Sequence, residues 1–486
     1  MKAEVSRLVR LLSRLGDDVR EVGAVSADDL ASIVAELLAA FDVYRAYVVP
    51  GEPPPRASRD RMAGAMAAAK RRLPGRLDAT ADLISALLLG HGVAADWRAT
   101  TDELIVRFQQ TCGAVQAKGV EDTAMYRWTP LLSANEVGAD PDQPGQSVAA
   151  FHDFARRLSE NWPASMTTLS THDTKRQEDV RARLAVLAES PGAWAAEVTA
   201  WHKRACELSG ARPPDPPTEY LMWQTLVGAW PIDDERLTSY LRKAMREAKL
   251  TTSWTDPDSE YEAAAISFAR RAIADGEIAG RIAAFVAWIG PDAISNSLGA
   301  KLVQLTMPGV PDVYQGCELT GLALVDPDNR MPVDYELRRS MLSGLRPAHL
   351  NGASPEVLDA AKLLVTSRAL GLRRDHPDWF AGDYQPLPGS GAAAAHLVAF
   401  CRVGQAITVA TRLPAHLRRS GGWRDTALNV PEGRWLDVLT GTDYLVTSSA
   451  TPGTRPMLSD LTRQLPVALL IRAETEADTR EAQGDQ

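Results

Sequence analysis

The stretch Leu169-Ser170-Thr171-His172-Asp173-Thr174-Lys175-Arg176 overlaps and follows a short apolar run, Met166–Ser170, that has the pattern of a strand. A charged loop directly after a short strand is typical of the carboxyl-terminal end of a strand in a (β/α) barrel, where catalytic groups lie. Taken alone, His172 and Asp173 also fit a helix cap or a buried hydrogen-bonded pair. The rest of the chain has to decide between these interpretations.

Two further segments have the same form. Leu104–Gln110 is predicted as a strand that leads into a loop containing Lys118, Glu121 and Asp122, and Lys301–Met307 as a strand that leads to Tyr314. The charged loop also fits a solvated ion pair, and Pro308-Gly309-Val310-Pro311 fits a simple strand stop. Short strands joined by helical stretches favour a (β/α) barrel.

Helical patterns surround these segments. The first hundred residues are predicted to be helical, with Ser26 and Asp29 at capping-box spacing ahead of Leu30–Phe41. Residues 186–290 are also predicted to be helical and carry six tryptophans, which serve either as core anchors or as platforms for sugar rings. These six are Trp194, Trp201, Trp223, Trp230, Trp254 and Trp288.

The last hundred residues have a different pattern. After a helix that follows Pro355, alternating apolar runs are separated by Gly, Pro and Asn turns, which predicts a small antiparallel β domain. The predicted strands are Leu397–Cys401, Ile407–Thr411, Trp435–Leu439 and Val467–Arg472.

Composition narrows the class of protein. The chain has 486 residues, 53 Lys and Arg against 62 Asp and Glu, and a formal net charge of −9. Such a chain lacks the basic surface that nucleic acids or anionic membranes attract, so we expect neither as a partner. The four cysteines are far apart and predict buried, reduced thiols. Neither a signal peptide nor a membrane-spanning run is expected, which favours a cytoplasmic protein.

Taken together, the motifs resemble those of the maltooligosyl trehalose synthases, in the alpha-amylase superfamily (glycoside hydrolase family 13). The resemblance rests on Phe-Gln-Gln at 108–110, on Lys-Gly-Val-Glu-Asp-Thr-Ala at 118–124 and on Ser-Thr-His-Asp-Thr-Lys-Arg at 170–176. It continues in Met-Pro-Gly-Val-Pro-Asp-Val-Tyr-Gln-Gly at 307–316, in Asp-Pro-Asp-Asn-Arg-x-Pro-Val-Asp-Tyr at 326–335 and in Phe-Asp-Val-Tyr-Arg-Ala-Tyr-Val at 41–48. Met125 and Trp128 are small departures from the family pattern.

The resemblance implies an α/β fold: the C-terminal part of a (β/α)8 TIM barrel, strands six to eight, with large helical insertions and a C-terminal antiparallel β domain. The implied segments are a helical insertion region over 1–100, strands six and seven with active-site loops over 101–185, and a Trp-rich helical insertion over 186–295. Strand eight with closing helices follows over 296–375, then the β domain over 376–475 and a polar tail over 476–486.

The function that the resemblance implies is an intramolecular transglycosylation. It converts the reducing-end α-1,4 bond of a maltooligosaccharide to an α,α-1,1 bond, the reaction of a (1→4)-α-D-glucan 1-α-D-glucosylmutase. Asp173 matches the family's third catalytic carboxylate, and the substrate-binding candidates are His172, Arg176, Lys118, Glu121 and Tyr314. The family's nucleophile and general acid belong to strands four and five, for which the sequence shows no counterpart. No metal or organic cofactor is expected.

Two other functions stay open at this point. One is a non-catalytic glucan-binding or regulatory remnant that kept these loops, and the other is a hydrolase or other transglycosylase of the amylase superfamily. The incomplete set of carboxylates predicts that this chain is inactive without a separate N-terminal fragment or subunit that carries the missing strands.

Overall fold

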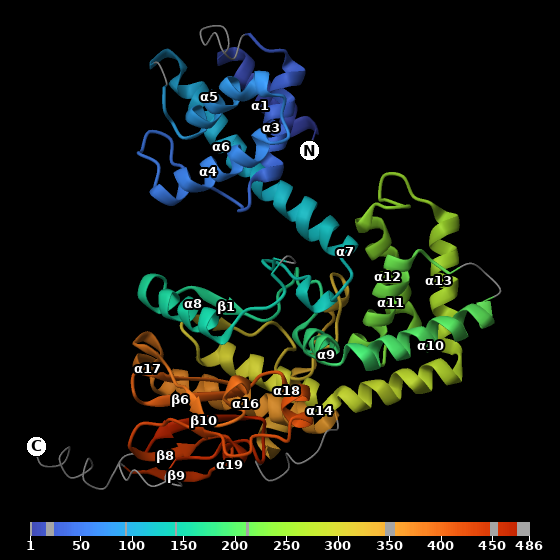
Figure 1. The fold of residues 1–486 in the computed structure, drawn as a ribbon, viewed down its shortest axis with the longest axis vertical. Coiled ribbons are helices and arrows are strands. Elements are labelled where there is room, and N and C mark those ends of the chain that lie inside the picture. Colours follow the sequence, from blue (N-terminus) through green and yellow to red (C-terminus); the bar gives the residue numbers. More distant parts are fainter. Residues whose placement is uncertain are drawn as a thin grey trace, which may run out of the picture. The chain divides into compact units, whose positions relative to one another are not determined.

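The computed structural model describes residues 2–15, 24–92, 95–140, 143–209, 213–345, 355–447 and 455–473. Contacts divide the chain into two compact units, Met1–Arg127 and Trp128–Gln486. Figure 1 shows helices in the first unit and a mixture of helices and strands in the second. The predicted tail over 476–486 lies outside the described residues.

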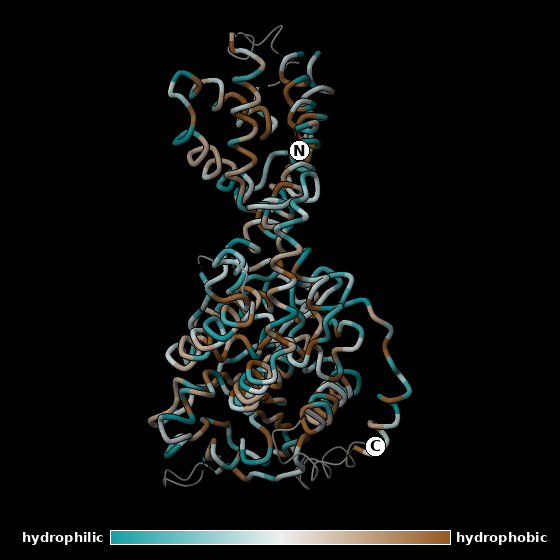
Figure 2. The backbone as a smooth tube through the Cα atoms, turned by 90° about the vertical axis from the view of Figure 1, so that its right-hand side faces the viewer, coloured by the Kyte–Doolittle hydropathy of each residue, from teal (hydrophilic) through white to brown (hydrophobic). Residues whose placement is uncertain are grey.

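The first unit is helical, as the sequence predicted. Its main helices share one apolar core, and Figure 2 shows hydrophobic residues, in brown, along these helices. Ser26 caps its helix as expected, because its hydroxyl oxygen accepts a hydrogen bond from the Asp29 amide at 3.1 Å. The helices are α1 (Lys2–Leu15), α3 (Ala27–Ala40), α4 (Arg56–Lys70), α5 (Asp78–Leu88), α6 (Arg98–Val115) and α7 (Met125–Arg127), with a π-helical segment Gln116–Ala124 before α7.

The strand predicted at Leu104–Gln110 is wrong, because these residues form the middle of α6. Leu104, Phe108 and Cys112 recur every four residues and are buried on one face of that helix. Glu103 and Arg107 pair on its outer surface at 3.7 Å. A seven-residue apolar run fits both a strand and a helix, and here the longer period of the flanking residues decides for the helix.

The second unit has a layer of long helices. Three of the tryptophans, Trp194, Trp201 and Trp223, are buried in it with their rings in contact, which confirms the core-anchor interpretation for these three. The helices are α8 (Val148–Asn161), α9 (Glu178–Glu189), α10 (Pro191–Ser209), α11 (Pro216–Ala229), α12 (Asp234–Ala248), α13 (Ser259–Ala274), α14 (Gly276–Thr306), α15 (Tyr335–Gly344), α16 (Pro355–Asp375), α17 (Pro377–Ala381), α18 (Pro414–Arg419) and α19 (Leu458–Leu461).

The strand predicted at Lys301–Met307 is also wrong, since Lys301–Thr306 ends helix α14. Leu298, Leu302 and Leu305 follow helical spacing and pack in one cluster with residues of α16. The strand comes later, as β2 (Val310–Asp312), so the Pro-Gly-Val-Pro segment enters a strand rather than stopping one. Gly309 makes the turn at a φ of +113°, where a Cβ would lie 2.7 Å from the Ser165 carbonyl oxygen.

A short parallel sheet positions the central motif. The strand predicted at Met166–Ser170 is present as β1 (Met166–Thr168), which pairs in parallel with β2. Gln304 of α14 donates hydrogen bonds to the carbonyl oxygens of Thr167 and Asp312, one on each strand. This parallel pair places the polar segments that follow β1 and β2 at the same end of the sheet.

The predicted C-terminal β region is confirmed as a six-stranded antiparallel sheet in the order β3-β5-β6-β10-β8-β9. Helices α14 and α16 share a buried apolar cluster with residues of β6 and β10. The strands of the sheet are β3 (Tyr384–Pro386), β5 (Leu397–Arg402), β6 (Ala406–Thr411), β8 (Gly433–Asp437), β9 (Asp443–Val446) and β10 (Val467–Arg472), and a separate pair consists of β4 (Gly389–Ser390) and β7 (Ala427–Leu428).

Judged by length and composition alone, helix α14 is long and apolar enough to cross a membrane. Core helices of folded domains can have the same length and composition. In α14 the polar residues Asp292, Lys301 and Gln304 are buried among neighbouring elements, which identifies it as a core helix of the second unit.

The four cysteines are reduced thiols, as expected. Cys112, Cys317 and Cys401 are buried, whereas Cys206 is partly exposed, so the prediction of burial is wrong for Cys206.

Candidate active site

The loop between β1 and α9 presents His172 and Asp173 to solvent. Its shape is set locally, since the Thr171 amide donates to the Thr174 hydroxyl at 2.6 Å and the Asp173 amide donates to the Thr171 hydroxyl at 3.2 Å. Thr174 is buried by this turn, and the two following side chains are buried as well. The interpretation of His172 and Asp173 as a buried pair therefore does not hold.

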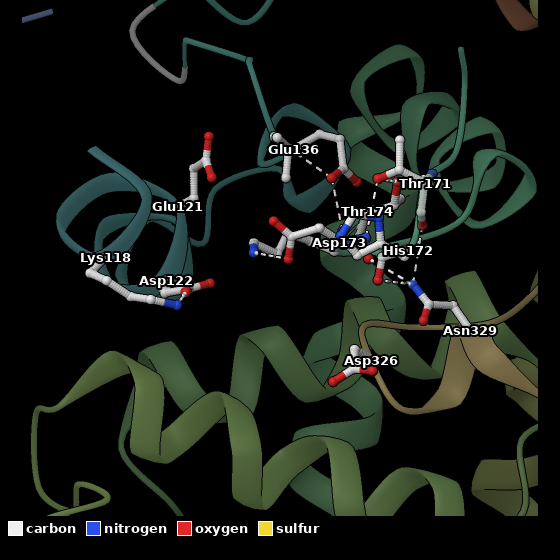
Figure 3. A network of polar contacts seen from close by, with 12 residues as sticks. Lys118, Glu121, Asp122, Glu136, Thr171, His172, Asp173, Thr174, Asp326 and Asn329 are labelled. Atoms are coloured by element: carbon white, nitrogen blue, oxygen red, sulfur yellow. Dashed lines mark hydrogen bonds and ion pairs between the residues drawn. The ribbon is translucent and has the colours of Figure 1, made fainter. Parts of the chain in front are cut away.

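Two buried side chains clamp this loop (Figure 3). The Glu136 carboxylate accepts the amide hydrogens of Lys175 at 2.8 Å and Arg176 at 3.2 Å. The Asn329 amide group donates to the carbonyl oxygens of Thr171 at 3.3 Å and His172 at 3.1 Å. The backbone that carries His172 and Asp173 is thus held from two segments far apart in the sequence.

A buried group of four charges lies where the loop enters α9. The Lys362 ammonium is 2.9 Å from the Glu178 carboxylate and 2.6 Å from that of Asp179, and Lys301 is 2.7 Å from Glu178. Ser170 donates to Glu178 at 3.0 Å, which joins this group to the end of the loop. Because removal of one member would leave a buried charge unpaired, the group holds α9, α14 and α16 in one arrangement.

The electrostatics of this group favour its charged state. Burial raises the pKa of the Glu178 carboxyl, but the ammonium groups of Lys362 and Lys301 more than offset burial and lower that pKa below its usual range. Burial likewise opposes the charge on Lys362, and the carboxylates of Asp179 and Glu178 outweigh it and raise the pKa of Lys362. Glu178 and Lys362 therefore stay ionised at neutral pH.

Asp173 itself has one charged neighbour in the loop. The Lys175 ammonium lies 3.6 Å from an Asp173 carboxylate oxygen, and the Lys175 side chain is buried while that of Asp173 is half exposed. An exposed carboxylate with a fixed backbone and an adjacent imidazole can bind sugar hydroxyls and stabilise positive charge.

Two predicted substrate-binding residues have structural partners. The Arg176 side chain is only 1 % exposed, and its guanidinium donates to the Tyr240 hydroxyl at 2.8 Å. The Tyr314 hydroxyl donates to the Asn329 carbonyl oxygen at 3.1 Å, and burial raises the pKa of this phenol. The structure therefore joins Tyr314 to the clamp residue Asn329 and places Arg176 in the interior.

A cavity of about 620 Å³ lies between α12 and the segment that follows β2. Its polar walls include Arg236, whose guanidinium binds both Asp328 carboxylate oxygens, at 2.7 and 2.9 Å. Lys243 donates to the Asp326 carbonyl oxygen at 2.6 Å. The lining residues are Gln177, Asp233, Glu235, Arg236, Ser239, Tyr240, Lys243, Gln315, Gly316, Thr320, Gly321, Leu322, Ala323, Val325, Asp326, Pro327, Asp328, Asn329, Met331 and Val333.

The remaining predicted site residues belong to the first unit. Lys118 and Glu121 lie on the π-helical segment Gln116–Ala124, a local geometry that is frequent at functional sites. The Glu121 side chain is buried and accepts a hydrogen bond from the Tyr44 hydroxyl, and the exposed Lys118 pairs with Asp122. The ion-pair interpretation of Lys118 is therefore confirmed, with Asp122 as its partner.

The sequence reasoning missed the clamp residue Glu136 and the cavity residue Arg236. Glu136 acts across 39 positions of sequence, and no local pattern marks it. Asp328 and Asn329 stood within a quoted motif, and the density of polar residues around Pro327 is a signal that could have identified them.

Comparison with known proteins agrees with the motifs. No protein-family model matches the chain. A protein of Mycobacterium tuberculosis (strain CDC 1551 / Oshkosh) described as a maltooligosyl trehalose synthase is 43 % identical over 378 residues, which are 76 % of this chain and 46 % of that protein. The chain of strain H37Rv with the same description matches equally.

Solved structures of proteins with the same kind of name are also similar to this chain. Maltooligosyltrehalose synthase from Arthrobacter ramosus is 38 % identical with a TM-score of 0.82, and the match covers 97 % of this chain and 56 % of that one. A structure described as DSM5389 glycosyltrehalose synthase is 27 % identical with a TM-score of 0.69, over 96 % of this chain and 55 % of that one. The chain is thus a relative of maltooligosyl trehalose synthases and spans about half the length of those it matches.

Proposed function

We propose that this chain supplies part of the active site for an intramolecular transglycosylation, which converts the reducing-end α-1,4 bond of a maltooligosaccharide to an α,α-1,1 bond. The observation that carries the proposal is the clamped loop that presents His172 and Asp173 at the end of β1. Relatives that share this fold are named for the synthesis of maltooligosyl trehalose.

In this proposal Asp173 is the third carboxylate of a retaining mechanism. Its negative charge stabilises the oxocarbenium-like transition state, and the His172 imidazole donates a hydrogen bond to a sugar hydroxyl. The nucleophile and the general acid, about 5–5.5 Å apart in such mechanisms, come from the part of the relatives that this chain does not match. The released glucose is then held so that its own hydroxyl attacks before water does.

We assign the holding of that glucose to Tyr314, and Lys118 and Glu121 stay substrate-binding candidates of the first unit. Arg176 is a positioning residue instead, because its buried guanidinium donates to the Tyr240 hydroxyl and to the Asn135 carbonyl oxygen. The protein would act in the cytoplasm on maltooligosaccharides, without a metal or organic cofactor.

The other strands of the barrel would come from a further segment or a separate chain. Two exposed apolar side chains on the parallel pair support this, with Met166 72 % and Val310 49 % exposed. An exposed apolar strand tends to pair with a strand of another segment or chain. A barrel closes when its strands complete one hydrogen-bonded ring.

The test mixes this chain with a fragment made of the part of a relative that this chain does not match, and follows the reducing ends of maltopentaose. We expect reducing ends to disappear in the mixture and not with this chain alone. Asp173→Asn keeps the shape of the side chain but removes its charge, so it should lower the rate by a factor on the order of 10³. Asp378→Asn, at an exposed carboxylate of α17, is the matched control and should have no effect.

Other outcomes decide against parts of the proposal. Full activity of the Asp173→Asn mixture would show that the carboxylate is wrongly assigned. An increase of reducing ends would identify a hydrolase. Binding of maltooligosaccharide by an inactive mixture would favour the glucan-binding remnant, a function that the 620 Å³ cavity with its polar walls also suits.

A further inference from the structure

Two tryptophans of the helical layer, Trp254 and Trp288, are exposed, and Trp254 is the more exposed of the two. Trp254 lies between α12 and α13 and is 54 % exposed, although an exposed indole loses the free energy that its burial would give. It does not line the cavity beside the candidate active site. Its exposure calls for a physical reason.

The ring of Trp254 is held in place from one side. The Arg246 guanidinium carbon lies 5.0 Å from the ring centroid, within the range of a cation–π contact. Arg246 cannot move freely, because it binds both Glu262 carboxylate oxygens at 2.7 and 2.9 Å. One face of the indole is therefore backed by a fixed cation, which leaves the opposite face for a ligand.

The loop that carries the ring is fixed as well. The Thr252 hydroxyl donates to Glu262 at 2.7 Å and accepts from the Asp258 amide at 3.0 Å. The Asp256 amide donates to the Ser253 hydroxyl at 2.9 Å, and the Ser253 amide donates to the Asp256 carbonyl oxygen at 3.0 Å. Because these hydrogen bonds already order the loop, binding of a ligand to Trp254 would cost little conformational entropy.

The surroundings of the ring suit a sugar better than a protein. Thr255, Asp256 and Asp258 beside it are exposed and polar, and Leu250 is the large apolar neighbour in the loop. A protein interface needs about 800 Å² on each partner, far more than one indole and one leucine provide. A pyranose ring needs one flat apolar surface under its C–H face and hydrogen-bonding groups at its rim.

We propose that Trp254 is a surface platform for an α-1,4-glucan chain, outside the candidate active site. One glucose unit stacks on the open indole face, and the Thr255 hydroxyl and the Asp256 carboxylate bind its hydroxyls. The choice of an α-1,4-glucan rests on the proposed function, whereas the platform rests on the geometry of Trp254. Its role is to retain a long substrate near the protein between encounters with the active site.

The test labels the full chain with 5-fluorotryptophan and assigns the Trp254 fluorine resonance by its loss in Trp254→Phe. Maltoheptaose should shift this resonance with a Kd on the order of 1 mM. The shift should persist in Asp173→Asn, because the platform does not depend on the active site. In gels that contain amylopectin, Trp254→Ala should lose most of the retardation at an unchanged melting temperature.

Trp162→Ala is the matched control, because Trp162 is 71 % exposed in the same unit at the end of α8. It should keep the retardation of the wild type. An unshifted Trp254 resonance, or equal loss in Trp162→Ala, would overturn the platform, and an equal shift with cellohexaose would overturn its preference for α-glucans. The transglycosylation assay with Asp173→Asn fails or succeeds independently of these results.

Discussion

At the scale of single residues, Asn329 holds the loop of His172 and Asp173 through the N–H donors of its side-chain amide. We expect Asn329→Ala to lower the free energy of unfolding by about 1–3 kcal/mol, because the carbonyl oxygens of Thr171 and His172 lose a buried donor. Asn329→Asp should cost more at neutral pH, since a carboxylate would face those oxygens.

Urea denaturation checks these values, and hydrogen exchange of the Thr174–Arg176 amides reports on the loop. Asn161→Ala is the control, since Asn161 is exposed on α8 and makes a single bond to the Arg157 carbonyl oxygen. Equal effects at positions 161 and 329 would contradict the clamp.

Asp437 predicts a pH dependence of stability. Burial raises its pKa from the ordinary value of 3.8 to about 6, although its carboxylate accepts from the Leu439 and Leu469 amides. The folded state therefore holds an extra proton between these two values, so stability is lost as the pH rises through about 6. Asp437→Asn keeps an acceptor oxygen and removes the buried charge.

We expect Asp437→Asn to be more stable than the wild type by up to about 3 kcal/mol above pH 7, and nearly equal to it near pH 4. Thermal unfolding across this range is the measurement. A variant that is less stable than the wild type at neutral pH would show that the ionised carboxylate is needed.

At the scale of elements, Gly228 sets how closely α9 and α11 pack. A Cβ at this position would lie 2.8 Å from Val180 Cγ1 and 3.2 Å from Leu184 Cγ. Gly228→Ala should therefore destabilise the protein by about 1–3 kcal/mol, despite the better helix propensity of alanine. Gly280→Ala in α14 is the matched control, because nothing lies within 4 Å of its Cβ, and it should stabilise slightly.

Melting temperatures of the two variants provide the measurement. If Gly228→Ala melts at or above the wild-type temperature, Val180 and Leu184 can shift without cost and the close approach is not a constraint.

The elements also show which parts of the fold can be predicted from sequence. Strands β5, β6 and β10 have long apolar runs between turns, and the Ser26 cap is a local signal, so these predictions are confirmed. The strand predictions for Leu104–Gln110 and Lys301–Met307 were wrong because a short apolar run fits both the helical and the strand period. The contacts that decide between the two are tertiary. His172 and Asp173 could be found in their motif, whereas Glu136 could not, because its role exists only after folding. The six predicted segments and the site assignments stay predictions.

At the scale of the whole molecule, the parallel pair β1 and β2 predicts self-association. In the part of the chain that the structure describes, parallel pairing is confined to these two strands, and their apolar residues Met166 and Val310 are exposed. Purified chain should bind a hydrophobic dye and scatter light as its concentration rises, since open strand edges recruit other chains.

The double variant Met166→Lys with Val310→Lys should reduce both signals several-fold. Leu445→Lys is the control, because Leu445 is 72 % exposed on the edge strand β9 of the antiparallel sheet, and its effect should be smaller. A wild-type chain that stays monomeric and binds no dye would contradict this prediction.

Helix α14 is long and contains a proline in its interior. Its 31 residues extend over about 46 Å, and Pro291 near the middle offers no amide hydrogen to the carbonyl of Ala287. The half that follows Pro291 packs against α16 and the antiparallel sheet. The half that precedes it packs against the helices that contain the buried tryptophans. The helix therefore lacks one internal hydrogen bond at this position, and we expect a load on the aromatic helices to bend it most easily at Gly290-Pro291.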